Sequence, residues 1–198
     1  MPTRTFLNLP KEKKLRVLRA AKKEFSRVPL EKAVIANIVK DADIPRGSFY
    51  QYFENIEDLF NYLINYMYGI DQKKFIKYVD ESNGDVYEAL KLRFANEIDK
   101  LTCEENRQFK INILSTIITS SSKSKVGPDI MDKQIPFGVV NFPEEQRKDK
   151  NVRSIVDIIK MISFSCLQRY LANLASETEI KKYYNNCIDC VKCSLTEA

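Results

Sequence analysis

Apolar residues recur at the three-to-four-residue spacing of amphipathic helices through the first fifty residues of the chain. The first predicted helix covers Lys11–Arg27, with lysines and arginines between its apolar positions. Val28-Pro29 ends it, because the residue before a proline disfavours helical backbone. A second helix is predicted from about residue 31 to residue 41, and a two-turn helix over Arg46–Phe53 follows a tight turn at Asp43.

Two short helices joined by a tight turn form the helix-turn-helix, which places its second helix in the major groove of DNA. Phe49 and Phe53 are four residues apart, so both are expected to pack onto the two preceding helices. The remaining side chains of this segment are then expected to point largely outward; they are Arg46, Ser48, Tyr50, Gln51 and Tyr52.

The rest of the chain is predicted to form a larger helical body. Asn55 is a suitable N-cap for a long helix. Further helices are expected over residues 86–103, 106–122, 152–175 and 178–195, with an irregular stretch at 120–150 that glycine and proline punctuate. No strand pairs and no internal repeat are recognisable. The predicted fold class is therefore all-α, with domains at residues 1–55 and 56–198.

Charge is distributed unevenly along the chain. The net charge is +5, but residues 1–53 hold 12 Lys or Arg against 5 Asp or Glu, and the remainder is slightly acidic. A basic head on a near-neutral body suits a phosphate-binding module. An ordinary solvated lysine-rich surface is the alternative, and charge alone does not separate the two.

Composition argues against an enzyme and against a membrane protein. The chain has no histidine, so Ser–His and Cys–His nucleophile pairs are excluded, and it shows no phosphate-binding glycine loop. No apolar run is long enough for a membrane span, and no signal segment is seen at the N-terminus. We therefore expect a cytoplasmic, non-enzymatic protein without a cofactor or a metal.

The segment Arg46-Gly47-Ser48-Phe49-Tyr50-x-Tyr52-Phe53 resembles the recognition helix of the tetracycline-repressor (TetR/AcrR) family. The spacing Ile38-x-x-x-Ala42-x-Ile44 before it and Glu57-x-Leu59 after it fit the same family. The resemblance covers about residues 14–64. It implies a homodimer whose C-terminal domain binds a small-molecule effector or a partner and carries the dimer contact.

Five positions depart from the family pattern, and several of them remove common phosphate contacts or caps: Glu24, Ala33, Asp43, Pro45 and Ile56. Ala33 stands where a threonine often caps the second helix, and Ile56 stands where a lysine is frequent. The phosphate contacts are therefore expected to shift towards other basic side chains, namely Arg4, Lys14, Arg46 and Lys32.

The predicted DNA-binding residues combine base readers with phosphate contacts: Arg46, Gly47, Ser48, Tyr50, Gln51, Tyr52, Lys14 and Lys32. Gly47 would let the backbone approach DNA closely. Arg46 suits guanine or phosphate, and Gln51 suits adenine. The alternatives are that Tyr50 and Tyr52 only brace the short helix, and that Arg46 and Gln51 are ordinary surface residues.

The dimer contact is expected on the last two helices, because one recognition helix alone makes too small an interface for specific regulation. Two apolar stripes are candidates; they are Val152, Ile155, Ile159, Ile162, Cys166 and Tyr170, and Ile180, Tyr183, Tyr184, Cys187, Ile188 and Val191. The alternative is that these residues only close the core of the monomer.

The remaining candidates are less specific. Cys187, Cys190 and Cys193 have a spacing found in iron–sulfur proteins, but they fall on a predicted helix, so reduced thiols are favoured over a cluster or a redox sensor. Effector-pocket residues are sought among Phe94, Ile98, Phe109, Ile113, Ile117 and Phe164, each of which is equally a core residue. The irregular 120–150 stretch is either a pocket lid or a surface loop.

These patterns predict a sequence-specific transcriptional regulator, a homodimeric repressor that binds a palindromic operator in double-stranded DNA and is released by an effector. The alternative is a helical protein-interaction module of the same fold that has lost operator binding.

Overall fold

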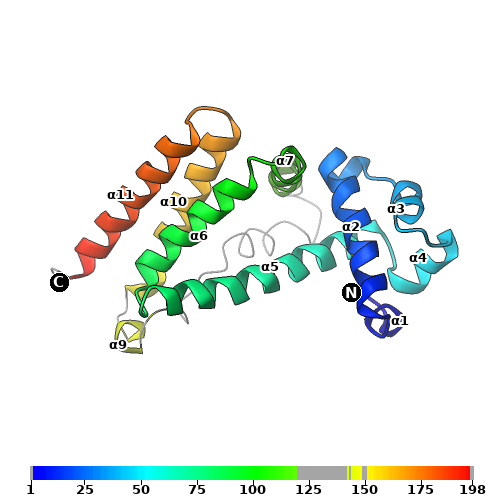
Figure 1. The fold of residues 1–198 in the computed structure, drawn as a ribbon, viewed down its shortest axis with the longest axis horizontal. Helices are drawn as coiled ribbons and strands as arrows, with labels where there is room; N and C mark the ends of the chain where they lie inside the picture. The colour runs from blue at the N-terminus through cyan, green and yellow to red at the C-terminus, as the bar shows by residue number, and fades with distance from the viewer. Residues whose placement is uncertain (1, 120–141, 143, 149–150, 197–198) are drawn as a thin grey trace. The chain divides into compact units, whose positions relative to one another are not determined.

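The structure is a computed structural model that describes residues 2–119, 142, 144–148 and 151–196. Every regular element within these residues is helical, which confirms the all-α class (Figure 1). The elements are α1 Arg4–Leu7, α2 Lys11–Arg27, the 3-10 turn η1 Leu30–Lys32, α3 Ile35–Asp41, α4 Arg46–Tyr52, α5 Ile56–Glu81, α6 Val86–Lys100, α7 Glu104–Thr119, α9 Glu144–Arg147, α10 Val152–Leu171 and α11 Glu177–Thr196.

The chain folds into two compact units. The first unit holds α1 to α4, α5 as far as Tyr68, and α7; the second holds the remainder of α5, α6, α9, α10 and α11. This division groups helices that are distant in sequence, whereas the predicted boundary at residue 55 divides the chain once. The domain boundary at residue 55 therefore remains a prediction.

The first unit is built around α2, whose buried face includes the predicted Val17, Leu18, Ala21 and Phe25. The Phe25 ring meets the ring of Phe60 from α5 edge to face, with centroids 4.9 Å apart. Such pairs add to the stabilisation that burial of apolar surface provides. The short helices α3 and α4 complete this core on the other side of the unit.

Helix α7 packs against α2 in the first unit and is fixed there by hydrogen bonds (Figure 1). The side-chain amide of Asn112 is buried and donates to the backbone carbonyls of Phe25 at 2.9 Å and Ser26 at 3.0 Å. Carbonyls in the last turn of a helix lack partners within the helix, so Asn112 satisfies two of those of α2. Gln108 in turn donates to Asn112 Oδ1 at 3.1 Å.

The candidate pocket residues are divided between the two units. Phe109 and Ile113 belong to the core of the first unit, and Phe94 and Ile98 are buried in the second. Phe164 on α10 is half-buried, and the side chain of Ile117 lies outside the described residues. Of the expected irregular stretch, α9 and Phe142 are described, and the Phe142 ring is buried against Tyr87 with centroids 6.0 Å apart.

The second unit packs α6 and α10 against α11. Phe94 of α6 stacks on Tyr184 of α11 with ring centroids 3.9 Å apart, and the Tyr184 hydroxyl lies 3.2 Å from Ser163 Oγ on α10. The turn before α6 has left-handed backbone at Asn83 and Gly84, two residue types that tolerate this conformation. Asp85 then caps α6 by accepting from the backbone N–H of Tyr87 at 3.0 Å.

Most residues of the two predicted dimer stripes lie in this core. The buried ones are Val152, Ile155, Ile159, Cys166, Tyr170, Ile180, Tyr184 and Ile188. They form the core of the second unit itself, which is the alternative to a dimer contact that the sequence left open. Tyr183 is exposed, whereas Ile162, Cys187 and Val191 are half-buried. A dimer contact through these helices would therefore use their exposed and half-buried positions, which include only a few members of the stripes.

Across the described ranges, none of the helices combines the length and the apolarity that crossing a bilayer requires.

The contact of Asn112 with α2 gives a stability prediction. Replacing Asn112 with Asp puts carboxylate oxygens against the carbonyls of Phe25 and Ser26 and removes both donors. We expect the free energy of unfolding to fall by about 2–3 kcal/mol at neutral pH. The control is Asn65→Asp, the same change at an exposed position of α5 in the same unit. Equal losses in urea titrations of the two variants would contradict this role of Asn112.

Candidate nucleic-acid interface

A tight turn joins α3 to α4 and sets the geometry of the candidate site. Asp43 has left-handed backbone with φ 49°, as its position in the turn predicts. The Ile44 N–H donates to the Val39 carbonyl at 3.1 Å, and the Ala42 N–H donates to the Ile38 carbonyl at 2.9 Å. These bonds close the end of α3, and Pro45 then precedes the first residue of α4.

The inner face of α4 packs into the first unit. Phe49 and Phe53 are fully buried, as predicted. Tyr52 is also buried, with 4% of its surface exposed, so the expectation that it points outward is wrong. Its ring lies 5.8 Å from that of Phe6, and the ammonium of Lys13 lies 6.0 Å from its centre. This burial favours the bracing alternative for Tyr52.

The outer face of α4 carries the other predicted residues. Arg46, Gly47 and Gln51 are exposed, Tyr50 is 51% exposed, and Ser48 is half-buried. A Cβ added at Gly47 would meet no atom within 4 Å, so the fold itself does not require glycine there. A molecule that approaches α4 at Gly47 would therefore meet the helix backbone directly.

The two predicted lysines lie outside α4. Lys32 is exposed at the end of η1. The Lys14 ammonium donates to the backbone carbonyl of Leu7 at 3.0 Å, so it helps to hold α1 in place. An ammonium has three donors, and this bond uses one of them. Phosphate binding by Lys14 and Lys32 stays a prediction, as do the DNA contacts of the α4 residues.

Two carboxylates near the turn are paired with α2. Lys23 binds Asp41 at 2.8 Å, and the hydrogen bond and the charge of Asp41 raise the pKa of Lys23. Arg16 lies 3.9 Å from Asp43, a looser pair. Each pair offsets a negative charge close to the recognition helix, where a DNA phosphate would otherwise be repelled.

Glu24 serves as the missing cap of α3. Its side chain is 4% exposed, and its oxygens accept from the Val34 backbone N–H at 2.9 Å, from the Asn37 amide at 3.1 Å and from Arg27 at 2.7 and 2.9 Å. Val34 is the N-cap residue of α3 and offers no capping side chain of its own. Ala33 therefore lies one residue before the cap, so the expectation that position 33 caps this helix is wrong. The Glu24 carboxylate of α2 binds the backbone N–H of the actual cap residue, Val34.

The environment of Glu24 determines its ionisation. Burial raises the pKa of its carboxyl, but the hydrogen bonds from Arg27, Val34 and Asn37 outweigh burial, and the pKa lies below its ordinary value. Hydrogen bonds to a carboxylate stabilise the charged form. Glu24 therefore stays ionised while it holds α2 to the start of α3.

An additional element, α1, also contacts the recognition helix and was not expected from the sequence. Thr3 caps α1, and its backbone N–H and its hydroxyl donate to carbonyls in the last turn of α4. Phe6 is fully buried beside Phe53, with ring centroids 4.6 Å apart. A threonine just before the short apolar run Phe6-Leu7 is the sequence signal that could have predicted this element.

The cysteine string lies within the regular helix α11. Cys187 is half-buried, and Cys190 and Cys193 are exposed. Where the structure describes side chains, it brings together no group of three or more Cys, Asp or Glu suited to a metal ion.

A short solvent-facing helix held by a tight turn on a three-helix core defines a helix-turn-helix DNA-binding domain. Residues 17–63 match the family described as bacterial regulatory proteins, tetR family. The N-terminal domain of the chain is thus similar to the DNA-binding domain of this family of regulators. Because the members of this family are transcriptional regulators, the match also supports the expectation that the protein is not an enzyme.

Two solved structures share the fold along nearly the whole chain. A TetR family transcriptional regulator from Chloroflexus aurantiacus J-10-FL has 18% identity and a TM-score of 0.53, over 98% of each chain. A TetR transcriptional regulator from Rhodococcus sp. RHA1 has 14% identity and a TM-score of 0.60, over 91% of this chain and 95% of its own. No curated protein matches the sequence.

The capping role of Glu24 predicts a pH effect. Because the pKa of Glu24 is lowered in the folded state, its contribution is full above the ordinary carboxyl pKa of about 4.5 and is lost as pH falls through the folded pKa. Glu24→Gln should lower the free energy of unfolding by about 1–3 kcal/mol at pH 7 and by less in acid. The measurement is urea unfolding from pH 3 to pH 7, with Glu12→Gln, an exposed position of α2, as control. A constant difference across this range would contradict the prediction.

Proposed function

We propose that the protein is a sequence-specific DNA-binding transcriptional regulator, a homodimeric repressor that an effector releases from its operator. The observation that carries this proposal is the outer face of α4, where Arg46, Gly47, Tyr50 and Gln51 are accessible while Phe49 holds the helix from below. Arginine and glutamine are side chains that read base edges in the major groove, and tyrosine hydroxyls bind phosphate.

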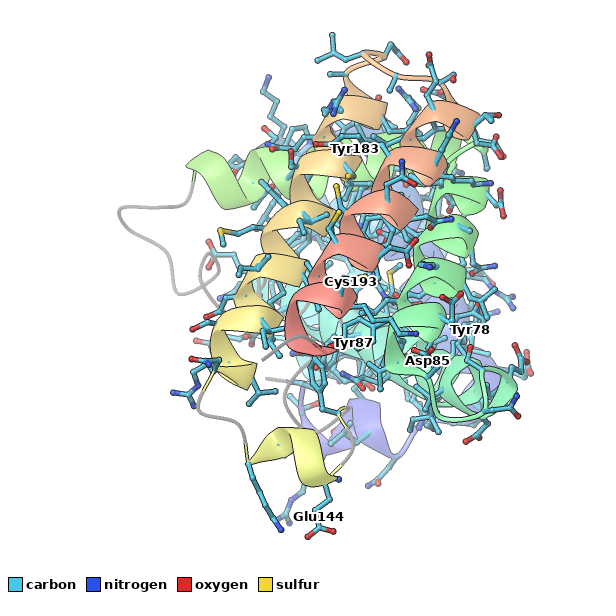
Figure 2. The ribbon with its side chains drawn as sticks, turned by 90° about the vertical axis from the view of Figure 1, so that its left-hand side faces the viewer. Tyr78, Asp85, Tyr87, Glu144, Tyr183 and Cys193 are labelled. Atoms are coloured by element: carbon cyan, nitrogen blue, oxygen red, sulfur yellow. The ribbon has the colours of Figure 1, made fainter. Side chains whose placement is uncertain are left out.

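The proposed dimer contact lies on the outer face of α10 and α11, which Figure 2 shows from the front. Ile158 and Met161 on α10 are 42% and 63% exposed, and Tyr183 on α11 is 48% exposed. Cys187 and Cys190 follow Tyr183 at four and seven residues, so they share its side of the helix. A face of this kind suits a two-fold helix-bundle contact, which would present two recognition helices to a palindromic operator.

An effector would release the dimer from DNA if it bound another arrangement of the dimer more tightly than the DNA-bound arrangement. We place the effector site among the central helices, as the family resemblance implies. The rival function is a protein-interaction module without operator binding. Two observations favour it: Tyr52 is buried, and Lys14 is engaged with α1, so two of the eight expected DNA contacts already serve the fold.

Selection of genomic DNA fragments on the purified protein, near physiological salt, decides between the two functions. Enrichment of one or a few palindromic sites with steep salt dependence supports the regulator. A folded, dimeric protein that enriches nothing would favour the interaction module.

Gly47 offers a sharp test of the DNA-binding face. In Gly47→Ala the new methyl group meets no protein atom, and alanine favours helix by up to about 1 kcal/mol, so the melting temperature should stay equal or rise. Affinity for the selected site should fall about tenfold, the cost of a poor base contact. The matched control is Gly69→Ala, a helical glycine in α5 with equally open surroundings. Unchanged affinity in Gly47→Ala would argue against close approach at this face.

The dimer contact is tested by Met161→Glu. A charge in the centre of an apolar contact is costly to bury, so we expect a monomer where the wild type is a dimer. The measurement is sedimentation equilibrium at micromolar concentration. Leu92→Glu, at an exposed apolar position on α6, is the control and should remain dimeric. Dissociation of both variants, or of neither, would contradict a contact through α10 and α11.

A further inference from the structure

The C-terminal end of α4 is held by a residue of the N-terminal segment. The Thr3 backbone N–H donates to the Tyr52 carbonyl at 3.0 Å, and the Thr3 hydroxyl donates to the Gln51 carbonyl at 2.6 Å. The last four carbonyls of a helix have no N–H partner within the helix. Thr3 thus supplies partners for two of them, next to side chains proposed to read DNA.

Helix α4 depends on such external contacts because it is short. It has seven residues, far below the length at which a helix is stable by itself in water. At its C-terminus the Phe53 N–H closes on the Phe49 carbonyl at 2.9 Å, and α4 ends there. The direction of the Gln51 peptide is therefore determined by Thr3 and by the packing of the neighbouring rings.

The segment that carries Thr3 is itself firmly attached to the first unit. Phe6 is fully buried, and its ring lies 4.6 Å from that of Phe53 and 5.3 Å from that of Tyr62. The Lys14 ammonium binds the carbonyl of Leu7 at the end of α1. Thr3 is thus held in place relative to α2 and α5. Its two hydrogen bonds therefore fix the last turn of α4 relative to the same helices.

We propose that Thr3 is a positioning residue for DNA recognition, which holds the Gln51 end of α4 in the orientation that reads bases. The proposal rests on the function proposed above. Phosphate contacts come from lysines and arginines that do not depend on this bond, whereas base contacts require side chains placed within a few tenths of an ångström. Thr3 should accordingly affect sequence preference more than general affinity for DNA.

The test compares three variants near the N-terminus. Thr3→Val keeps the shape of the side chain and removes both the hydroxyl donor to Gln51 and the acceptor that caps α1, and Thr3→Ser restores both. Thr5→Val makes the same change at an exposed position in α1. Binding is measured on the duplex most enriched by genomic selection and on a scrambled duplex of equal composition. Amide hydrogen exchange across residues 46–54 reports the order of α4 without DNA.

We expect Thr3→Val to bind the enriched duplex about five- to tenfold more weakly, the effect of one lost hydrogen bond to a carbonyl, and to bind the scrambled duplex as wild type does. Amides near the end of α4 should exchange faster in this variant alone, and the melting temperature should change little. Thr3→Ser should restore affinity and protection. A serine variant as weak as the valine variant would overturn the proposal.

Other outcomes overturn it separately from the proposed function. If the wild type prefers one duplex and Thr3→Val prefers it equally, α4 reads DNA without help from Thr3. An equal loss in Thr5→Val, or an equal loss on the scrambled duplex, would show a general effect on α1 instead of positioning. If the wild type itself prefers no duplex, the proposed function fails, and the recognition role of Thr3 fails with it.

Discussion

The burial of Phe49 and Phe53 against an aromatic cluster is the interaction on which the candidate site depends. A helix of seven residues does not persist in water, so α4 exists only because these two rings are removed from solvent. The rings of Phe6 and Tyr62 from α1 and α5 complete the cluster. The exposed residues of α4 are therefore positioned by the buried ones, and recognition and stability use opposite sides of the same short helix.

The departures from the family pattern acquire a physical meaning in this structure. A glutamate in place of leucine at position 24 would be costly in an apolar core. It is accommodated because the start of α3 offers an uncapped backbone N–H at Val34 and an amide at Asn37. The cap of α3 is Val34, which has no capping side chain, and Glu24 binds its backbone N–H from a neighbouring helix.

Much of the fold could be predicted from local patterns in the sequence. The bounds of α2, the left-handed backbone of Asp43 and the burial of Phe49 follow from spacing and turn chemistry within a few residues. One prediction failed for a local reason and another because of a long-range contact. Helix α3 begins at Ile35, later than predicted, because residues 30–32 form a 3-10 turn and Val34 is extended. The burial of Tyr52 depends on Phe6, a partner 46 positions away that no periodicity reveals.

The placement of α7 has a consequence for how the chain folds. The first unit draws on residues 1–68 and then on α7, after the intervening chain has contributed the end of α5 and all of α6 to the second unit. The hydrogen bond between Asn112 and Phe25 spans 87 positions, a long separation in a helical protein, where most contacts are local. During synthesis the N-terminal helices emerge long before α7 can cover α2. The first unit is therefore completed late in synthesis. Until α7 packs against α2, an apolar face of α2 stays exposed to solvent and can cause aggregation.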